Sequence, residues 1–167
     1  MEIRRRRSRR SPPDPRYHQV FLDAHIFDEN DDVEITSAVA EILGPMRESV
    51  RILLPHSVKA EIDRPQTPAR VKALASGLIY SIPVELNQGE NETHNRLRII
   101  MKGNALSDQH DADAFHVVEA AKYGGYFVTL DRRILKKKSE ISSVLPGLWI
   151  VKPQELVDIF RSTACET

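Results

Sequence analysis

Four acidic side chains occupy positions from which they could act together on a substrate. Asp23 and Asp131 each follow a short run of apolar, β-prone residues, and Glu61 and Asp113 lie in segments with helical spacing. Clustered carboxylates cannot all stay ionised without a cation, and their hard oxygens select Mg²⁺ or Mn²⁺. Such a metal activates water and neutralises a phosphodiester in its transition state. The sequence therefore predicts that these four acids are both the metal ligands and the catalytic residues of a hydrolase.

One stretch, residues 107–138, must position two of these acids. It reads as a helix, a tight turn, a buried strand and the start of a second helix. Ser107 or Asp108 can cap the first helix, and the glycine pair 124–125 ends it because glycine tolerates a left-handed backbone. The strand at residues 126–129 stops just before an acid. Ligands bind at the carboxyl ends of parallel strands, so both acids of this stretch are expected at that edge.

The rest of the chain alternates strands with helices. Asp31 or Asp32 should cap the first helix, and a polar connection at 88–93 should precede a short helix ending at Gly103. Pro83 places its strand at a sheet edge, because proline cannot donate to a ladder. The remaining predicted strands cover residues 19–22, 50–54, 81–86 and 148–151. This order predicts an α/β fold, a three-layer α/β/α sandwich with a largely parallel central sheet.

Composition limits the classes of protein that fit. A chain of 167 residues with 41% apolar content forms one ordinary domain. No segment approaches the roughly 18 apolar residues of a membrane span, and no apolar segment follows the basic N-terminus as in a secretory signal. The single cysteine, Cys165, cannot form an internal disulfide. A cytoplasmic protein without membrane contact is the expectation.

Charge is distributed unevenly along the chain. Residues 1–16 hold seven arginines against Glu2 and Asp14, a net charge of +5, and the remainder carries −5 because the whole chain sums to zero. We expect a disordered basic arm at 1–16, one domain at 17–161 and a tail at 162–167. A basic arm on an acidic domain favours a polyanionic partner, and an unstructured, solvated tail is the alternative.

Three of the four acids also have a purely structural interpretation. Asp131 could cap the helix that follows it, Asp113 could be a first-turn acid favoured by the helix dipole, and Glu61 could be an exposed helix residue. Asp23, at the end of an apolar strand, is the hardest to explain in this way. Their joint placement favours the metal site.

Taken in order, these residues resemble a PIN domain, the fold of many metal-dependent ribonucleases and of VapC-like toxins from toxin–antitoxin pairs. The resemblance covers about residues 17–161. It is carried by residues 20–23, 57–61, 113–121, 127–131 and 150–156.

The resemblance implies an activity and its partners. The four acids would share one or two Mg²⁺ or Mn²⁺ ions, and a metal-bound hydroxide would cleave an RNA phosphodiester to a 5′-phosphate and a 3′-hydroxyl. Thr129 would hold a carboxylate or a water from the second shell. The expected partners are an RNA substrate, a cognate antitoxin protein and a second copy in a homodimer.

The chain departs from this family just after the first acid. Family members commonly place a small polar residue there, whereas Ala24 and His25 follow Asp23. His25 could fill that role, touch substrate or simply pack in the fold. His116, one turn beyond Asp113, could orient that carboxylate or be structural.

Charged residues beside the acids leave further alternatives open. Asp111 is either an alternate ligand or a helix-capping acid. Arg132, Arg133 and Lys136 follow the last acid and could grip substrate phosphates, a contact that weakens with salt. A solvated helix face is the other interpretation of this basic run, which continues through Lys137 and Lys138.

Two other functions compete with the nuclease. A catalytically degenerate PIN-like domain that binds RNA or protein is favoured by the Ala24-His25 departure and the basic arm. A phosphoaspartate protein using Asp23 is the weakest candidate. His25 stands where such phosphatases need a second aspartate, and the acidic pair of a receiver is absent.

Overall fold

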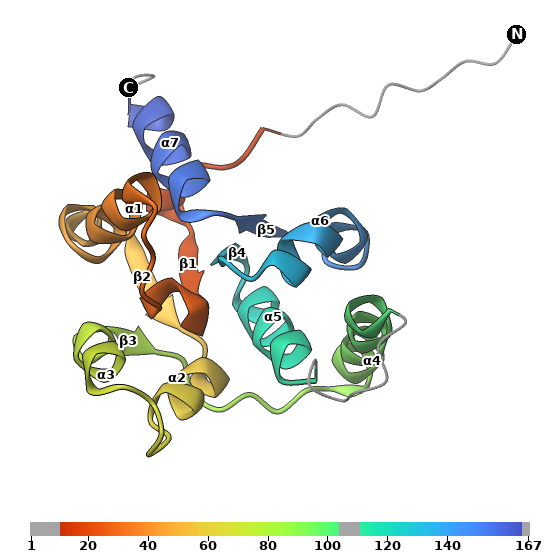
Figure 1. Cartoon of the computed structure of the whole chain (residues 1–167). Coiled ribbons are helices and arrows are strands. Elements are labelled where there is room, and N and C mark those ends of the chain that lie inside the picture. Colours follow the sequence, from red (N-terminus) through yellow and green to blue (C-terminus); the bar gives the residue numbers. More distant parts are fainter. Residues whose placement is uncertain (1–10, 104–110, 165–167) are drawn as a thin grey trace, which may run out of the picture.

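The computed structural model describes residues 11–103 and 111–164. Five strands form one sheet in the order β3-β2-β1-β4-β5, and every neighbouring pair is parallel. The strands are β1 (Gln19–Leu22), β2 (Arg51–Leu54), β3 (Ile79–Tyr80), β4 (Gly125–Val128) and β5 (Leu148–Val151). Helices cover both faces of this sheet (Figure 1). The predicted three-layer α/β/α sandwich is therefore confirmed.

Each face of the sheet has its own set of helices and its own apolar core. One core joins the sheet to α1 (Val33–Leu43), α2 (His56–Ile62), α3 (Ala69–Ala75) and α7 (Pro153–Ala164). The other joins it to α4 (Gln88–Lys102), α5 (Asp111–Tyr123) and α6 (Arg132–Val144). Three 3₁₀ turns complete the described elements: η1 (Pro15–Tyr17), η2 (Ala24–Phe27) and η3 (Pro45–Glu48).

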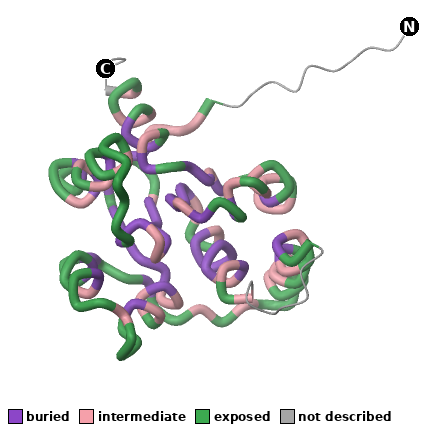
Figure 2. The backbone as a smooth tube through the Cα atoms, viewed as in Figure 1, coloured by how far each residue is buried: buried purple, intermediate pink, exposed green. Residues whose placement is uncertain are grey.

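Strand side chains alternate between the two cores. Val20 and Leu22 of β1 enter the first core, and Phe21 between them enters the second. This is the period-two alternation of a strand whose two faces are both covered. Buried residues therefore line the middle of the molecule and continue along α5 (Figure 2).

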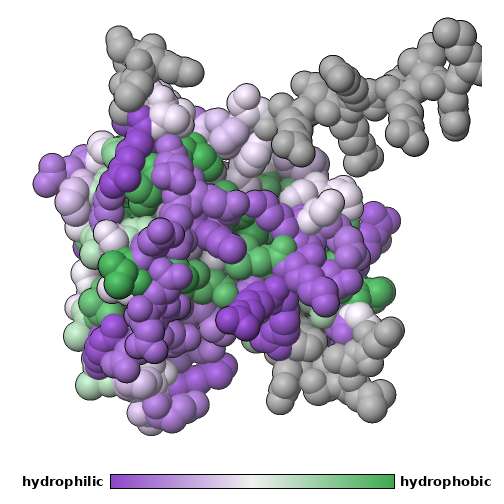
Figure 3. Space-filling model, turned by 45° about the horizontal axis from the view of Figure 1, so that its top comes forward, coloured by the Kyte–Doolittle hydropathy of each residue, from purple (hydrophilic) through white to green (hydrophobic). Residues whose placement is uncertain are grey.

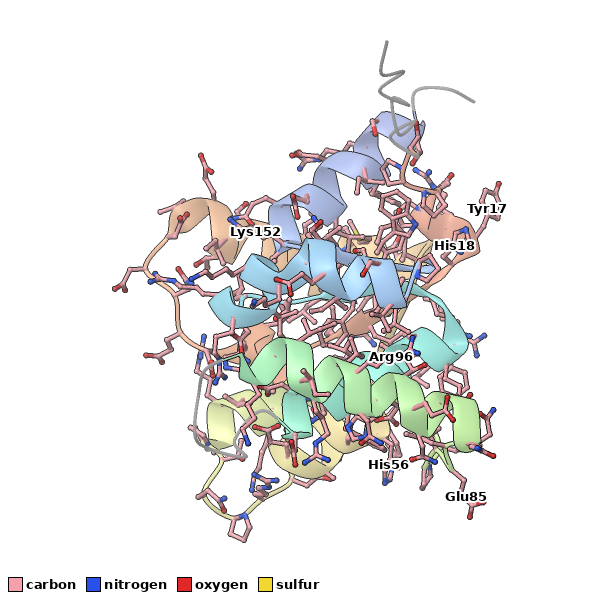
Figure 4. The ribbon with its side chains drawn as sticks, turned by 90° about the vertical axis from the view of Figure 1, so that its right-hand side faces the viewer. Tyr17, His18, His56, Glu85, Arg96 and Lys152 are labelled. Carbon is pink, nitrogen blue, oxygen red and sulfur yellow. The ribbon has the colours of Figure 1, made fainter. Side chains whose placement is uncertain are left out.

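Helix α5 is enclosed by its neighbours. Figure 4 views the molecule from the side of α4 and α6, which lie next to each other in front of α5. Arg98 of α4 forms a two-bond ion pair with Asp111, with both N–O distances 2.6 Å. This pair fixes the start of α5 and gives Asp111 a structural partner.

The structure corrects two local predictions and decides a third, which the sequence left open between two residues. The edge strand is β3, at Ile79–Tyr80, and not residues 81–86. Its predicted edge position is confirmed, and the backbone N–H of Ser81 makes one further bond before the chain reaches Pro83. Residues 88–93 are helical because Asn87 and Glu90 form a capping box at the start of α4. Asp32, rather than Asp31, caps α1.

Residues 13–16 of the predicted arm pack against the domain. The guanidinium of Arg16 lies 4.4 Å from the ring centroid of Phe160 and donates a 3.2 Å hydrogen bond to Thr163 Oγ1. The Tyr126 hydroxyl donates to the carbonyl of Pro13. These contacts tie the segment to β4 and to α7. Helix α7 continues to Ala164, within the predicted tail.

Some predictions fall outside the described residues: most of the arm (1–10), the caps at Ser107 or Asp108, and Cys165. Among the helices within 11–103 and 111–164, none is long and apolar enough to cross a membrane. The face seen in Figure 3 is mostly hydrophilic, with apolar atoms between the polar side chains.

Candidate functional site

The site lies where the order of the strands reverses. From β1 the chain builds β2 and β3 on one side and then β4 and β5 on the other, so β1 and β4 flank a topological switch point. In open α/β sheets the crevice at the carboxyl ends of such strands is the usual ligand site. Asp23 follows β1 directly, and Thr129 and Asp131 follow β4.

Two hydrogen bonds hold the Asp23 carboxylate at this crevice. The Asp23 carboxylate, 2% exposed as a residue, accepts bonds from the backbone N–H of Ala24 at 2.8 Å and from Thr129 Oγ1 at 2.6 Å. Thr129 Oγ1 in turn accepts the backbone N–H of Asp131 at 2.9 Å. One buried hydroxyl thus connects both strand-end acids.

His25 occupies the position at which the chain departs from the PIN pattern. Its Nδ1 lies 3.2 Å from Asp23 Oδ2. The hydrogen bond to Asp23 raises the pKa of His25 to about 9, against the opposing effect of burial. The imidazolium therefore supplies the polar contact to the first acid that a small polar residue was expected to make.

Asp131 and Asp113 meet through Arg133. Asp131 caps α6 by accepting the backbone N–H of Arg133 at 2.7 Å, so its structural interpretation is confirmed. The Arg133 Nη2 lies 3.1 Å from Asp131 Oδ2 and 3.2 Å from Asp113 Oδ2. Asp113 stands in the first turn of α5. Asp131, the cap of α6, and Asp113, in the first turn of α5, therefore both contact the Arg133 guanidinium.

The charges of these acids act on one another. Burial, together with the nearby carboxylates of Asp131 and Asp23, raises the pKa of Asp113, although Arg133 opposes the shift. Burial would also raise the pKa of Asp131, but hydrogen bonds from Arg133 outweigh it and the pKa is lowered. The site therefore carries closely spaced negative charge that Arg133 and His25 compensate in part.

His116 lies between Glu61 and the other acids. The imidazole Nδ1 lies 4.0 Å from Asp23 Oδ1, and its Nε2 lies 3.6 Å from Glu61 Oε2. His116 is buried, whereas the Glu61 side chain is 38% exposed. A hollow of about 260 Å³ beside Glu61 is also lined by Ala24 and Arg64. The fourth predicted acid thus forms the outer rim of the site.

The other predicted cations lie on the surface of α6. Arg132 and Lys136 are exposed, as is Arg133 taken as a whole residue. Lys137 and Lys138 pair with Glu140 and Glu155. Arg132 and Lys136 are accessible to solvent, as side chains that bind a substrate phosphate must be. Arg133, in contrast, already binds carboxylates.

The most completely buried acid of the region, Glu119, was given no role by the sequence. Its side chain on α5 is fully buried and accepts the backbone N–H groups of His56 at 2.7 Å and Ser57 at 3.0 Å. The hydroxyls of Ser57 and Ser81 donate to it at 2.5 and 3.0 Å. Figure 4 labels His56, where α2 begins.

Glu119 positions α2 along α5. It holds the first residues of α2, whose N-cap, Pro55, provides no side-chain acceptor. Since Glu61 near the end of α2 lies by His116, the two helices run in opposite directions along this contact. A signal was present in the sequence: Glu119 is the one charge in the apolar run Val117–Ala121.

The donor chemistry of the site fits Mg²⁺ or Mn²⁺, but the donors are not preassembled. Asp23, Asp113 and Asp131 offer the hard carboxylate oxygens that such ions take. Within residues 11–103 and 111–164, no group of three or more His, Cys, Asp or Glu side chains is already arranged to hold a metal. The Arg133 guanidinium lies between two of the donors. A metal would need this guanidinium to move.

Comparison with known proteins gives no match to a family model and none to a curated sequence. The class of protein is therefore defined by the structure: an α/β/α sandwich with an all-parallel five-stranded sheet and an acidic cluster at its switch point.

Proposed function

We propose that this chain is a PIN-type endoribonuclease that hydrolyses RNA phosphodiesters with Mg²⁺ or Mn²⁺. The observation that carries the proposal is the convergence of Asp23, Asp113 and Asp131 at the switch point of a parallel sheet. These acids are far apart in the sequence, and a site for ligands is expected there on topological grounds alone. The ordered resemblance to PIN motifs adds the reaction.

Asp23, Asp113 and Asp131 would hold the metal, with Glu61 at the rim. When bound, the ion would activate a water molecule and neutralise charge on the phosphodiester. Thr129 binds both the Asp23 carboxylate and the backbone N–H of Asp131, so these two residues keep a fixed relation to each other. His116 lies between Asp23 and Glu61 and separates the inner acids from the rim.

The substrate would approach over a surface of mixed charge. Arg132 and Lys136 are exposed on α6, which starts at Asp131, so their charges lie on the element next to the acids. Contacts from such side chains to phosphates are independent of sequence and weaken with salt. By the same resemblance, the protein would be a toxin, would form a homodimer and would bind a cognate antitoxin.

A catalytically degenerate domain that binds RNA or protein is the second candidate. The observation that favours it is Arg133, which supplies a cation to Asp113 and Asp131 without any metal. A site balanced by its own arginine can persist as a purely structural feature.

RNA cleavage by metal-stripped protein separates these functions. We expect cleavage with added MnCl₂, products with 5′-phosphate and 3′-hydroxyl ends, and a loss of about 100-fold or more in Asp113→Asn. Glu92→Gln is the control, because it removes one carboxylate charge from an exposed position on α4. Cleavage that survives EDTA or Asp113→Asn contradicts the proposal. RNA binding without cleavage by the wild type supports the degenerate domain.

A further inference from the structure

The Arg133 guanidinium contacts the carboxylates of both Asp113 and Asp131. Its Nη2 is within 3.2 Å of both Asp113 Oδ2 and Asp131 Oδ2, and its Nε is 3.4 Å from Asp131 Oδ1. Two carboxylates that converge on one cation are also the donor set of a divalent ion. The side chain therefore competes for the same oxygens that a metal would use.

The two acids are more buried than the arginine that contacts them. The Asp131 and Asp113 side chains are 5% and 14% exposed, but that of Arg133 is 49% exposed. Asp131 is also held by main-chain bonds that do not involve the guanidinium: it accepts the backbone N–H of Arg133, and its own N–H donates to Thr129. Release of the guanidinium into solvent thus leaves the carboxylate in place.

We propose that Arg133 is an exchangeable counter-ion of the site, which neutralises Asp113 and Asp131 in the metal-free protein and leaves them when a divalent cation binds. This inference rests on the proposed function. It assigns Arg133 a role before substrate binding, distinct from the phosphate contact that the sequence suggested. Once displaced, its guanidinium joins the exposed charges of Arg132 and Lys136 on the same helix.

The exchange lowers the apparent affinity for metal. A divalent ion must break the hydrogen bonds between Arg133 and the two acids before it gains its own contacts. Charge-assisted bonds of this kind, reduced by the half exposure of the arginine, correspond to roughly three- to tenfold in an equilibrium constant. A variant without the guanidinium should therefore bind metal more tightly by about that factor.

Calorimetric titration of metal-stripped protein with MnCl₂ measures this directly. We expect Arg133→Gln to bind Mn²⁺ roughly three- to tenfold more tightly than the wild type. Arg132→Gln is the matched control, since it removes the same charge from the adjacent exposed position and should change the affinity less than twofold. Thermal unfolding in EDTA checks that each variant is folded, and Arg133→Lys tests whether a cation without the planar fork competes less.

The outcomes separate the inference from the proposed function. Mn²⁺ binding by the wild type that is equal or weaker in Arg133→Gln overturns the exchange and leaves the nuclease proposal standing, because Arg133 would then support the ligands. Equal tightening in both Arg variants also overturns it, since net charge alone would explain the gain. Absence of saturable Mn²⁺ binding in the wild type and in Arg133→Gln overturns both proposals.

Discussion

Two of the carboxylates on helix α5 are in opposite situations. Glu119 is fully buried and accepts four hydrogen bonds from donors fixed in the fold, two of them backbone N–H groups. Asp113, six residues earlier, lies among other acids and contacts a half-exposed arginine. The first is a completed structural contact. The second is a partly buried acid whose pKa is raised by burial and by neighbouring carboxylates, and such perturbed groups are typical of functional sites.

Removal of the Glu119 carboxylate should produce the largest effect. Glu119→Ala removes the acceptor of the Ser57 N–H and of the Ser57 and Ser81 hydroxyls, and it leaves the His56 N–H with the Ser81 hydroxyl alone. We expect a loss of about 3 kcal/mol in the free energy of unfolding by denaturant titration. Exposed Glu92 on α4 gives the control, since Glu92→Ala should stay within about 0.5 kcal/mol. A loss below about 1 kcal/mol for Glu119→Ala would mean that the cluster is not the structural anchor described above.

Added metal should stabilise the protein through Asp113 and its neighbouring acids, and not through the Glu119 cluster. At 100 times its dissociation constant, Mn²⁺ should raise the free energy of unfolding of the wild type by about 2.7 kcal/mol, seen as a higher melting temperature. Asp113→Asn should lose most of that gain, while Ser81→Ala, in the Glu119 cluster, should keep it. An equal gain in wild type and Asp113→Asn contradicts a role for Asp113 in metal binding.

Loss of one donor to Glu119 should have a smaller effect. The Ser81 hydroxyl donates to Glu119 and accepts the backbone N–H of His56 at 2.9 Å. Ser81→Ala should therefore cost about 1 kcal/mol in equilibrium unfolding, because the remaining donors still satisfy the carboxylate. Ser139→Ala, at an exposed position on α6, is the control. An equal loss of stability in Ser139→Ala would show that the effect of Ser81→Ala does not come from its bond to Glu119.

Asp113→Asn should change stability in the opposite direction and by the least. The pKa of Asp113 is raised by burial and by Asp131, so its ionised form is less stable in the folded than in the unfolded protein. In EDTA at pH 7 the variant should gain up to about 1 kcal/mol. This gain should vanish as the pH falls through the raised pKa and below the ordinary value of 3.8, since both states then bind the proton. A destabilised variant at pH 7 would show that the contact with Arg133 outweighs the repulsion.

The sequence was informative where local pattern determines structure. Asp23 and Asp131 could be placed at strand ends because each follows a short apolar, β-prone run, and the parallel sheet then brings them together. The sequence did not give the partners of Glu119, which come from residues 38 and 62 positions away. Arg133 belongs to a run of cations, and such a run does not show which side chain contacts the acids.

Anomalous diffraction at the manganese edge, from a crystal soaked in MnCl₂, tests the central claim most directly. We predict a peak at about 2.0–2.5 Å from carboxylate oxygens of Asp113 and Asp131, with the Arg133 guanidinium displaced from between them. A soaked crystal with no peak at these acids, and with Arg133 still paired to both, would contradict the account.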